Sequence, residues 1–323
     1  MRYKIIIDSA IPYIQGVFEP WCDVVYEAGS KIDRAMAGDA DALIIRTRTH
    51  CDKALLEGSS VKVVSTATIG MDHIDSEWCG KAGIAVFNAP GCNADAVMEY
   101  VFAALNAISA KKGIDMAGMT LGVIGVGHVG SKVVDMALQR GFNVLMSDPP
   151  RELAEGSEGF TPLPELLEKC DIVTLHIPLW PENVSFADEK FFAALRPGTV
   201  FINASRGEVV DEEALKAAAH RLGGIVMDVF RNEPHLDPEV INVADIVTPH
   251  IAGYSNVGKI NGTVAAVRSV AEVLDIEELK QFSIIHSHKP FDIEAYDIMA
   301  DDAALRAHPE DFEQLRSHYK LRG

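Results

Sequence analysis

Three residues in the second half of the chain have side chains suited to acid–base chemistry on a small anion: Arg206 in NASRG, Glu233 in NEP and His250 in PHIAGY. A guanidinium can hold a carboxylate through two parallel hydrogen bonds, and an imidazole that a carboxylate orients can exchange a proton near neutral pH. With a nucleotide cradle, this set would suffice for hydride transfer to or from a 2-hydroxy acid. Taken singly, a loop arginine is more often a surface charge, a loop glutamate is about as often a solvated acid as a functional one, and a histidine beside a proline is more often structural.

A glycine-rich segment, Gly125-Val-Gly127-His-Val-Gly130, offers such a cradle. The motif alone is weak, because it also occurs in ordinary tight turns, but here it stands between the strand-like run LGVIGV and the helix-forming run SKVVDMALQRG. Gly125 would allow the tight turn, Gly127 the approach of backbone amides to a pyrophosphate, and Gly130 close packing of helix on strand. His128 and Val129 complete the predicted cofactor-binding loop.

Asp148 ends the next strand-like run, at the separation of about twenty residues that dinucleotide-binding folds use. A carboxylate there can accept hydrogen bonds from the adenosine ribose hydroxyls and would repel a 2′-phosphate, so we expect NAD rather than NADP. Arg151 could weaken that preference, although Pro149 and Pro150 restrict the backbone between the two side chains.

Short apolar runs that alternate with helix-compatible stretches must position these residues. In the first ninety residues the runs are KIIID, ADALIIR, KVVSTAT and AVFN; the second series is LGVIGV, FNVLMSD, DIVTLHIP, TVFINAS, GGIVMDVF and DIVTPHI. This alternation predicts an α/β protein with two doubly wound parallel sheets. A long amphipathic helix, capped at Asn93 and ending before Lys111, would connect the two domains.

Composition limits the class of protein. A length of 323 residues with 48% apolar content suits two packed domains, and a formal charge of −18 argues against binding to nucleic acid or to an anionic membrane. We find neither a targeting pattern nor an apolar run long enough to span a membrane. The five cysteines lack a CxxC pair, so neither a disulfide framework nor a bound metal is expected. We therefore expect a cytoplasmic protein.

Nearly the whole chain resembles the D-isomer-specific 2-hydroxyacid dehydrogenases. The likeness is carried by ATIGMDHID, NAPGCNADAVMEYVFAAL, GVIGVGHVGSKV, INASRGEVVDEEAL, MDVFRNEP and PHIAGYSNVGK. Within the family, the forms SDPP, APGCNA and HIAGY point to a branch that acts on a phosphorylated 2-hydroxy acid. The resemblance implies a Rossmann NAD domain, residues 93–256, inserted in a flavodoxin-like substrate domain formed by 1–92 and 257–285. It also implies a homodimer, with residues 286–323 as a dimerisation extension that is shorter than usual.

The resemblance assigns a role to each of the three reactive residues. Arg206 would bind the substrate carboxylate and C2 oxygen, His250 would exchange the proton of the C2 hydroxyl, and Glu233 would orient His250 and favour its protonated form. Asp228 and Gly253 would lie against NAD. Contacts with the substrate are expected from Arg46, Thr47, Thr68 and Tyr254. Because Arg46 and Arg48 alternate with threonines, only one register of that segment should point inward.

The segment after HIP departs from the family pattern. LWPENVSFADEKFF, which contains Trp180, is shorter than the usual loop, Ser185 and Phe186 replace a His-Leu pair, and Ile177 replaces a polar residue expected against NAD. The cofactor contacts of this segment are therefore left open.

The tail after Pro309 carries an apolar stripe of Phe312, Leu315 and Tyr319. A stripe this small usually packs on its own domain, but the resemblance favours a dimer contact.

We predict an NAD-dependent dehydrogenase of a small phosphorylated D-2-hydroxy acid. One alternative is a dehydrogenase for another small D-2-hydroxy acid, of the phosphoglycerate or glyoxylate type. A different class of function, a non-catalytic NAD-sensing scaffold, is disfavoured by the presence of Arg206, Glu233 and His250 together.

Overall fold

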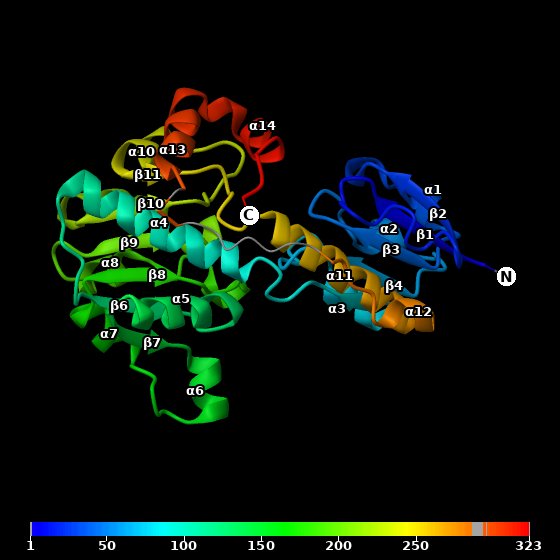
Figure 1. Ribbon diagram of the computed structural model, residues 1–323, viewed down its shortest axis with the longest axis horizontal. Coiled ribbons are helices and arrows are strands. Elements are labelled where there is room, and N and C mark those ends of the chain that lie inside the picture. Colours follow the sequence, from blue (N-terminus) through cyan, green and yellow to red (C-terminus); the bar gives the residue numbers. More distant parts are fainter. Residues whose placement is uncertain (1, 286–292, 295, 323) are drawn as a thin grey trace. The chain divides into compact units, whose positions relative to one another are not determined.

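The computed structural model describes residues 2–285, 293–294 and 296–322, which fall into two compact units (Figure 1). The first unit contains the residues up to Asn93 and those from Ser255 to 285. The second contains Ala94–Tyr254 and the described part of the tail up to Arg322. No helix of the described residues is long and apolar enough to cross a membrane.

The first unit is built on a five-stranded parallel sheet in the order β2-β1-β3-β4-β5, the flavodoxin-like order. Its strands are β1 (Tyr3–Asp8), β2 (Cys22–Glu27), β3 (Ala42–Ile45), β4 (Val63–Thr66) and β5 (Ala85–Phe87). Its helices are η1 (Gly29–Lys31), α1 (Arg34–Ala37), α2 (Lys53–Leu56), α3 (Ser76–Lys81), α11 (Asn256–Val273) and α12 (Glu277–Lys280).

Both faces of this sheet are buried, because successive side chains of a strand point to opposite sides. Ile5 and Ile7 of β1 join the core formed with α11, whereas Ile6 joins the core formed with α1, α2 and α3. Helix α11 begins at Asn256, where the Ser255 side chain accepts a hydrogen bond from the amide of Gly258 at 3.0 Å. The return of the chain to the first unit therefore supplies one of its covering helices.

The second unit is built on a six-stranded parallel sheet in the order β11-β10-β9-β8-β6-β7. Its strands are β6 (Thr120–Ile124), β7 (Asn143–Ser147), β8 (Ile172–Leu175), β9 (Val200–Asn203), β10 (Gly224–Met227) and β11 (Ile246–Val247). Its helices up to the tail are α4 (Ala94–Lys112), α5 (His128–Gln139), α6 (Pro149–Glu155), α7 (Leu163–Lys169), η2 (Pro181–Asn183), α8 (Glu189–Ala194), η3 (Gly207–Val209), α9 (Glu212–Ala218), η4 (Ala219–Arg221) and α10 (Pro238–Val243).

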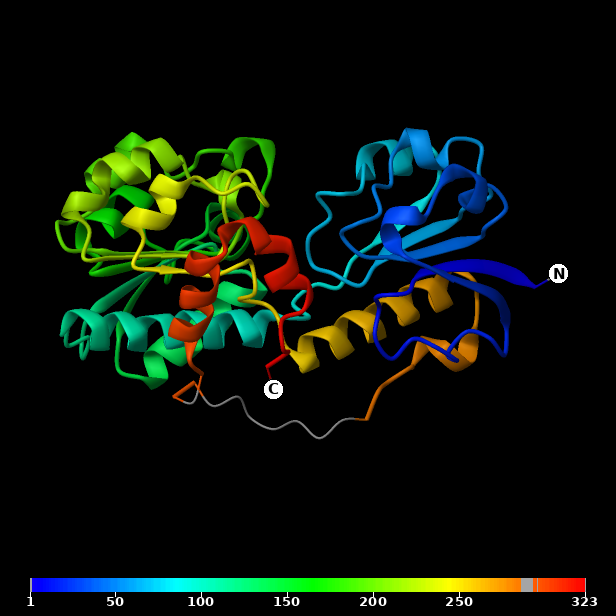
Figure 2. The same ribbon diagram turned by 90° about the horizontal axis from the view of Figure 1, so that it is seen from above.

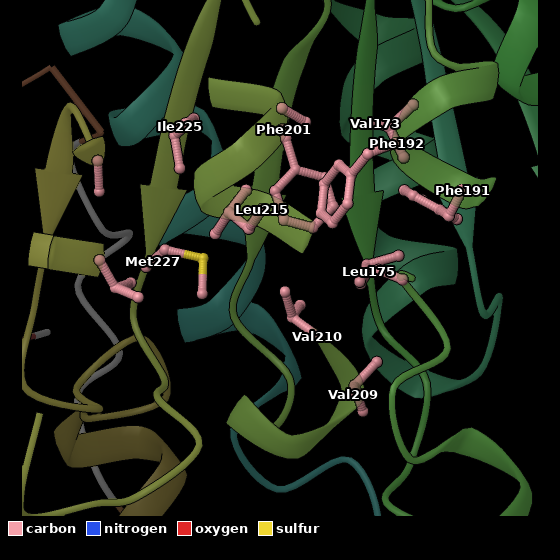
Figure 3. Close-up of a cluster of buried hydrophobic side chains, with 14 of the residues drawn as sticks. Val173, Leu175, Phe191, Phe192, Phe201, Val209, Val210, Leu215, Ile225 and Met227 are labelled. Atoms are coloured by element: carbon pink, nitrogen blue, oxygen red, sulfur yellow. The ribbon is translucent and has the colours of Figure 1, made fainter. Parts of the chain in front are cut away.

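Two apolar clusters cover the two faces of this second sheet. Helices α4 and α5 contribute to one cluster, and α7 to α10 contribute to the other. Figure 3 shows part of the latter, where Phe192, Phe201 and Leu215 gather beside Ile225 and Met227. The sheet is therefore buried on both sides, as parallel sheets with crossover helices require.

The register of the second sheet brings the carboxyl ends of its strands to one edge. Ile124 of β6 pairs with Leu175 of β8, Leu175 with Asn203 of β9, Asn203 with Met227 of β10, and Met227 with Val247 of β11. Each of these residues ends its strand, so the loops that follow meet at the same edge. Those loops carry the glycine-rich segment, Arg206, Glu233 and His250, and this edge is where doubly wound folds bind their ligands.

The predicted fold class of two parallel α/β sheets is confirmed. All ten predicted strand runs contain strands, but β2 was missed, because it is a half-exposed edge strand that carries charges. The predicted connecting helix, α4, extends through Lys112 rather than ending before Lys111, and it is buried on more sides than one amphipathic stripe, since Tyr100, Phe102 and Ala103 are buried as well.

The tail folds back on the second unit as α13 (Ile298–Ala307), η5 (Pro309–Asp311) and α14 (Phe312–Ser317). In Figures 1 and 2 its helices lie over the edge of the sheet that contains β11. Phe312 is fully buried with its ring centroid 6.3 Å from that of Phe230, and Tyr319 donates to Asp301 at 2.9 Å. Phe312 is therefore covered by its own unit, whereas a dimer contact by the half-buried Leu315 and Tyr319 stays a prediction. Residues 286–292, 295 and 323 of the predicted extension lie outside the described residues.

Candidate active site

The glycine-rich loop has the geometry that a dinucleotide requires. Gly125 has a φ of +84°, and a Cβ on it would lie 2.6 Å from the carbonyl oxygen of His176. A Cβ on Gly130 would collide with the carbonyl of Gly125, whereas one on Gly127 would meet no described atom within 4 Å. Gly127 is the N-cap of α5 and makes no side-chain cap, so the first amides of this helix remain available to an anion. The loop therefore fits a pyrophosphate, with exposed His128 and half-buried Val129 in the first turn of the helix.

Asp148 ties the end of β7 to the glycine-rich loop. Its Oδ2 accepts the amide of Val126 at 2.7 Å, and its Oδ1 accepts the amide of Arg151 at 3.0 Å as the N-cap of α6. The guanidinium of Arg151 reaches the Val126 carbonyl at 2.6 Å and is held by Glu155 at 2.7 Å. The half-buried carboxylate is thus fixed beside the loop, in the place expected for a group that contacts the adenosine ribose.

Arg206 stands at the end of a turn shaped by Asn203, a buried residue that the sequence reasoning missed. The side chain of Asn203 accepts the amide and hydroxyl of Ser205 at 3.1 and 2.8 Å and donates to the carbonyl of Arg206 at 2.9 Å. Asn and Ser side chains commonly close such turns, and the NAS run was the available signal. The guanidinium of Arg206 donates to the carbonyl of Ser205 at 2.8 Å.

The Arg206 turn lies directly against the segment that leads to Glu233. A Cβ on Gly207 would collide with the backbone carbonyl of Phe230 and would lie 2.5 Å from the amide of Arg231. That amide is held by the buried carboxylate of Glu212 at 2.8 Å, and burial raises the pKa of Glu212. Only glycine can therefore follow Arg206, and the two predicted catalytic loops touch through their backbones.

Glu233 and His250 form a hydrogen-bonded pair. Nδ1 of His250 lies 2.8 Å from Oε2 of Glu233, and Oε1 of Glu233 accepts the amide of Phe230 at 2.9 Å. The two side chains are 25% and 18% exposed, so the pair is largely removed from water while the imidazole remains accessible. Burial acts to raise the pKa of Glu233, but the charge and hydrogen bond of His250 outweigh it and lower that pKa. This is the arrangement of an acid–base histidine oriented by an ionised carboxylate.

Asp228 organises the loop that carries His250. Its buried carboxylate accepts the Thr248 hydroxyl at 2.6 Å and the amides of Ile251 and Ala252 at 2.8 and 2.9 Å, while its carbonyl accepts the amide of His250 at 2.8 Å. Burial raises the pKa of Asp228, and these hydrogen bonds oppose that effect. A contact of Asp228 with NAD remains a prediction.

Gly253 and Tyr254 follow this anchored loop and are half-buried. The ring of Tyr254 lies 6.2 Å from that of Tyr319, and the guanidinium of Arg316 lies 6.0 Å from the Tyr254 centroid. The tail thus lines the loop on which Tyr254 stands. Sequence reasoning missed this, because contacts between residues so far apart along the chain leave no local pattern.

The predicted residues of the first unit gather at the carboxyl edge of its own sheet. Ile45 and Thr66 pair in register, so Arg46 and Thr47, which follow β3, lie beside Thr68, which follows β4. Thr68 shares a hydrogen bond of 2.7 Å with Thr66, and Arg46 donates to the carbonyl of Ala10 at 3.3 Å. Their contact with a substrate remains a prediction.

The shortened segment after β8 is hydrogen-bonded to the two predicted catalytic loops. Ser185 donates its amide to the carbonyl of Glu208 at 2.8 Å, and its hydroxyl accepts from the guanidinium of Arg231 at 3.0 Å. Ile177 borders the glycine-rich loop, with Cγ2 2.8 Å from the position of a Cβ on Gly125. The departures from the family pattern therefore leave the sheet edge intact.

Comparison with known proteins agrees with these observations. The sequence model of a protein family, the D-isomer specific 2-hydroxyacid dehydrogenase NAD-binding domain, matches residues 96–252. An erythronate-4-phosphate dehydrogenase of Bacteroides fragilis is 44% identical over 335 aligned positions, which cover 99% of this chain and 96% of that protein. An erythronate-4-phosphate dehydrogenase of Shigella flexneri is 37% identical, with 98% and 90% covered.

A solved structure with the same fold is that of D-lactate dehydrogenase from Aquifex aeolicus, complexed with NAD and lactic acid. It superposes with a TM-score of 0.72 at 26% identity, covering 88% of this chain and 100% of that chain. The resemblance seen in the sequence is thus confirmed: this chain belongs to the D-isomer specific 2-hydroxyacid dehydrogenases, and its second unit contains their NAD-binding domain.

Proposed function

We propose that this enzyme oxidises 4-phospho-D-erythronate at C2 to the corresponding 2-oxo acid, with NAD as cofactor, in the synthesis of pyridoxal phosphate. The observation that carries the chemistry is the Glu233–His250 pair, 2.8 Å apart, at the sheet edge that also holds the glycine-rich loop and Arg206. The choice of substrate rests on relatives named erythronate-4-phosphate dehydrogenase that match nearly the whole chain.

The residues of the site divide the reaction between them. NAD, when bound through Gly125, Gly127, Gly130 and Asp148, supplies the acceptor for the hydride that leaves C2. Because Nδ1 of His250 is committed to Glu233, Nε2 is the nitrogen that accepts the proton of the C2 hydroxyl as the carbonyl forms. Glu233, whose pKa is lowered, stays ionised and stabilises the positive charge that His250 gains. In the reverse direction, His250 returns the proton to the C2 oxygen.

The two anionic ends of the substrate require separate cations. Arg206 is our choice for the carboxylate, since a guanidinium matches it with two parallel hydrogen bonds. For the phosphate we propose Arg46, supported by the hydroxyls of Thr47 and Thr68 at the same edge of the first sheet. Tyr254 would complete the substrate contacts, and Gly253 and Asp228 those with NAD.

We further propose that the enzyme is a cytoplasmic homodimer. The described cysteines, Cys22, Cys51, Cys79, Cys92 and Cys170, are all free thiols, as a reducing compartment would leave them. The dimer is carried over from the resemblance alone. Light scattering on the purified protein would test it, and a monomeric mass would contradict it.

A direct assay tests the reaction. Nicotinamide absorbance should report rapid reduction of NAD with 4-phosphoerythronate, and little with 3-phosphoglycerate in its place. His250→Ala should abolish the signal. Turnover of 3-phosphoglycerate alone would keep the family chemistry and overturn the proposed substrate, whereas full activity of His250→Ala would overturn the proposed acid–base residue.

A further inference from the structure

In the loop that carries His250 and Tyr254, backbone amides and backbone carbonyls are both bound by side chains from other parts of the chain. Its amides are taken by Asp228, as described above. Its carbonyls are taken by Arg322, at the end of the tail: Nη2 donates to the carbonyl of Ile251 at 3.0 Å and to that of Ala252, and Nε donates to the carbonyl of Tyr254 at 3.3 Å. A single guanidinium thus binds three carbonyls of the loop whose amides Asp228 binds.

Arg322 is itself fixed in place. It is 7% exposed, and its guanidinium lies 4.6 Å from the ring centroid of Tyr296. Tyr296 in turn donates its hydroxyl to Asp301 of α13 at 2.7 Å. A buried charge is costly unless hydrogen bonds compensate it, so an arginine in this position is expected to hold one geometry.

The loop requires such support because His250 has a strained backbone. Its φ is +56°, in the left-handed region that residues other than glycine rarely adopt and that costs roughly 1–2 kcal/mol. A conformation of this kind persists only where the surroundings hold it. Releasing the carbonyl side would let the loop relax and would move the imidazole relative to Glu233 and to the substrate.

We propose that Arg322 is a positioning residue for catalysis, which fixes the loop of His250 and Tyr254 in its reactive geometry. This inference rests on the proposed role of His250 and places the tail, which lies outside the matched domain of residues 96–252, in the service of the active site.

Arg306 provides a matched control. It too is an arginine of the tail whose guanidinium donates to two backbone carbonyls, those of Ile241 at 2.6 Å and Ala244 at 2.7 Å, and it also binds Asp302 at 2.9 Å. The carbonyls that Arg306 binds belong to the end of α10 rather than to the loop of His250. Arg306→Met and Arg322→Met should therefore destabilise the fold by similar mechanisms, but only the second should disturb His250.

The experiment compares kcat, the Kd of NAD and Tm for the full-length variants, well below their melting temperatures. Arg322→Met should lower kcat about 10- to 100-fold with little change in NAD affinity, since a displacement of about 1 Å can cost a hundredfold in rate. Arg306→Met should keep kcat within about twofold. Arg322→Lys should recover part of the rate, because an ammonium can still donate to the carbonyls. An Arg322→Met enzyme with undiminished kcat, or an Arg306→Met enzyme with an equal loss, would overturn the proposal.

Hydrogen exchange separates this proposal from the assignment of substrate. The amides of residues 250–254 should exchange faster in Arg322→Met than in the wild type or in Arg306→Met, whatever acid the enzyme oxidises. Unchanged exchange in Arg322→Met overturns the positioning role. Failure of the wild type to oxidise 4-phosphoerythronate, with the exchange difference present, overturns the substrate alone.

Discussion

Oε2 of Glu233 accepts a hydrogen bond from Nδ1 of His250 at 2.8 Å, while Oε1 of the same carboxylate is anchored by the amide of Phe230 at 2.9 Å. The backbone amide of Phe230 therefore fixes the orientation of the carboxylate, and the other carboxylate oxygen faces the imidazole. The hydrogen bond fixes both the direction of the ring and the nitrogen that faces the substrate.

Glu233→Gln should lower kcat about a hundredfold or more, because a neutral amide of the same shape neither stabilises the protonated imidazole nor fixes its tautomer. The affinity for NAD should change little. Steady-state kinetics together with NAD titration would check this. A variant with normal kcat would show that His250 is oriented by other groups.

The same pair predicts a pH dependence of stability. Since the pKa of Glu233 is lower in the folded than in the unfolded protein, the unfolded chain binds more protons as pH falls, and the stabilisation by Glu233 is lost as pH drops through the lowered pKa. The wild type should therefore exceed Glu233→Gln in Tm near pH 7, with the gap closing as pH falls through the lowered pKa of Glu233. A gap that stays constant over this range would contradict the assigned direction.

Arg206→Lys should reduce kcat and raise the KM of the substrate together, because lysine keeps the charge but loses the planar fork that holds a carboxylate. The turn itself should survive, since Asn203 binds the main-chain carbonyl of residue 206 and not its side chain. Circular dichroism and NAD binding should be unchanged. Full activity of this variant would remove Arg206 from the site.

Much of the second unit could be predicted from the sequence, because parallel strands buried on both faces appear as continuous apolar runs. The edge strand β2, with its mixed burial and its charged Asp23 and Glu27, has no such run and was missed. The glycine-rich loop was predictable for a related reason: its spacing is imposed by local backbone geometry at Gly125 and Gly130.

The supports of the site were harder to predict than its reactive groups. Arg206, Glu233 and His250 lie in recognisable motifs, but Arg322 meets Ile251 across 71 positions of the chain, and only folding brings the two together. For Phe312, burial was predictable from the sequence, but the surface that buries it was not. A helical apolar stripe indicates that a face is buried but not what covers it, and here the cover is the enzyme's own second unit.

Asp148→Ser should raise kcat/KM with NADP relative to NAD, because it removes a carboxylate that would repel a 2′-phosphate. Serine can still cap α6 at the amide of Arg151. Arg151, whose amide Asp148 caps, is then a neighbouring cation that could bind the added phosphate, so combining the change with Arg151→Ala should cancel the gain. Kinetics with both cofactors would check this, and an unchanged preference would mean that the ribose is read elsewhere.

Glu99 gives a further prediction, which concerns stability. This glutamate of α4 is 9% exposed, and burial raises its pKa to about 7, although the charge of Arg322 opposes the rise. The pKa of Glu99 is therefore higher in the folded than in the unfolded protein. At a pH below the unfolded pKa, Glu99 is neutral in both states and does not lower the free energy of unfolding. As the pH rises toward the folded pKa, the free energy of unfolding falls, because the charged form is less favourable in the folded protein.

Glu99→Gln should therefore match the wild type in stability near pH 4 and exceed it near pH 8, by roughly 1–3 kcal/mol. Glutamine keeps the shape of the neutral acid and cannot ionise, so the excess measures the cost of burying the charge in the wild type. Urea unfolding at both pH values would determine it. An excess that does not grow with pH would mean that Glu99 ionises in the folded protein as readily as in the unfolded chain.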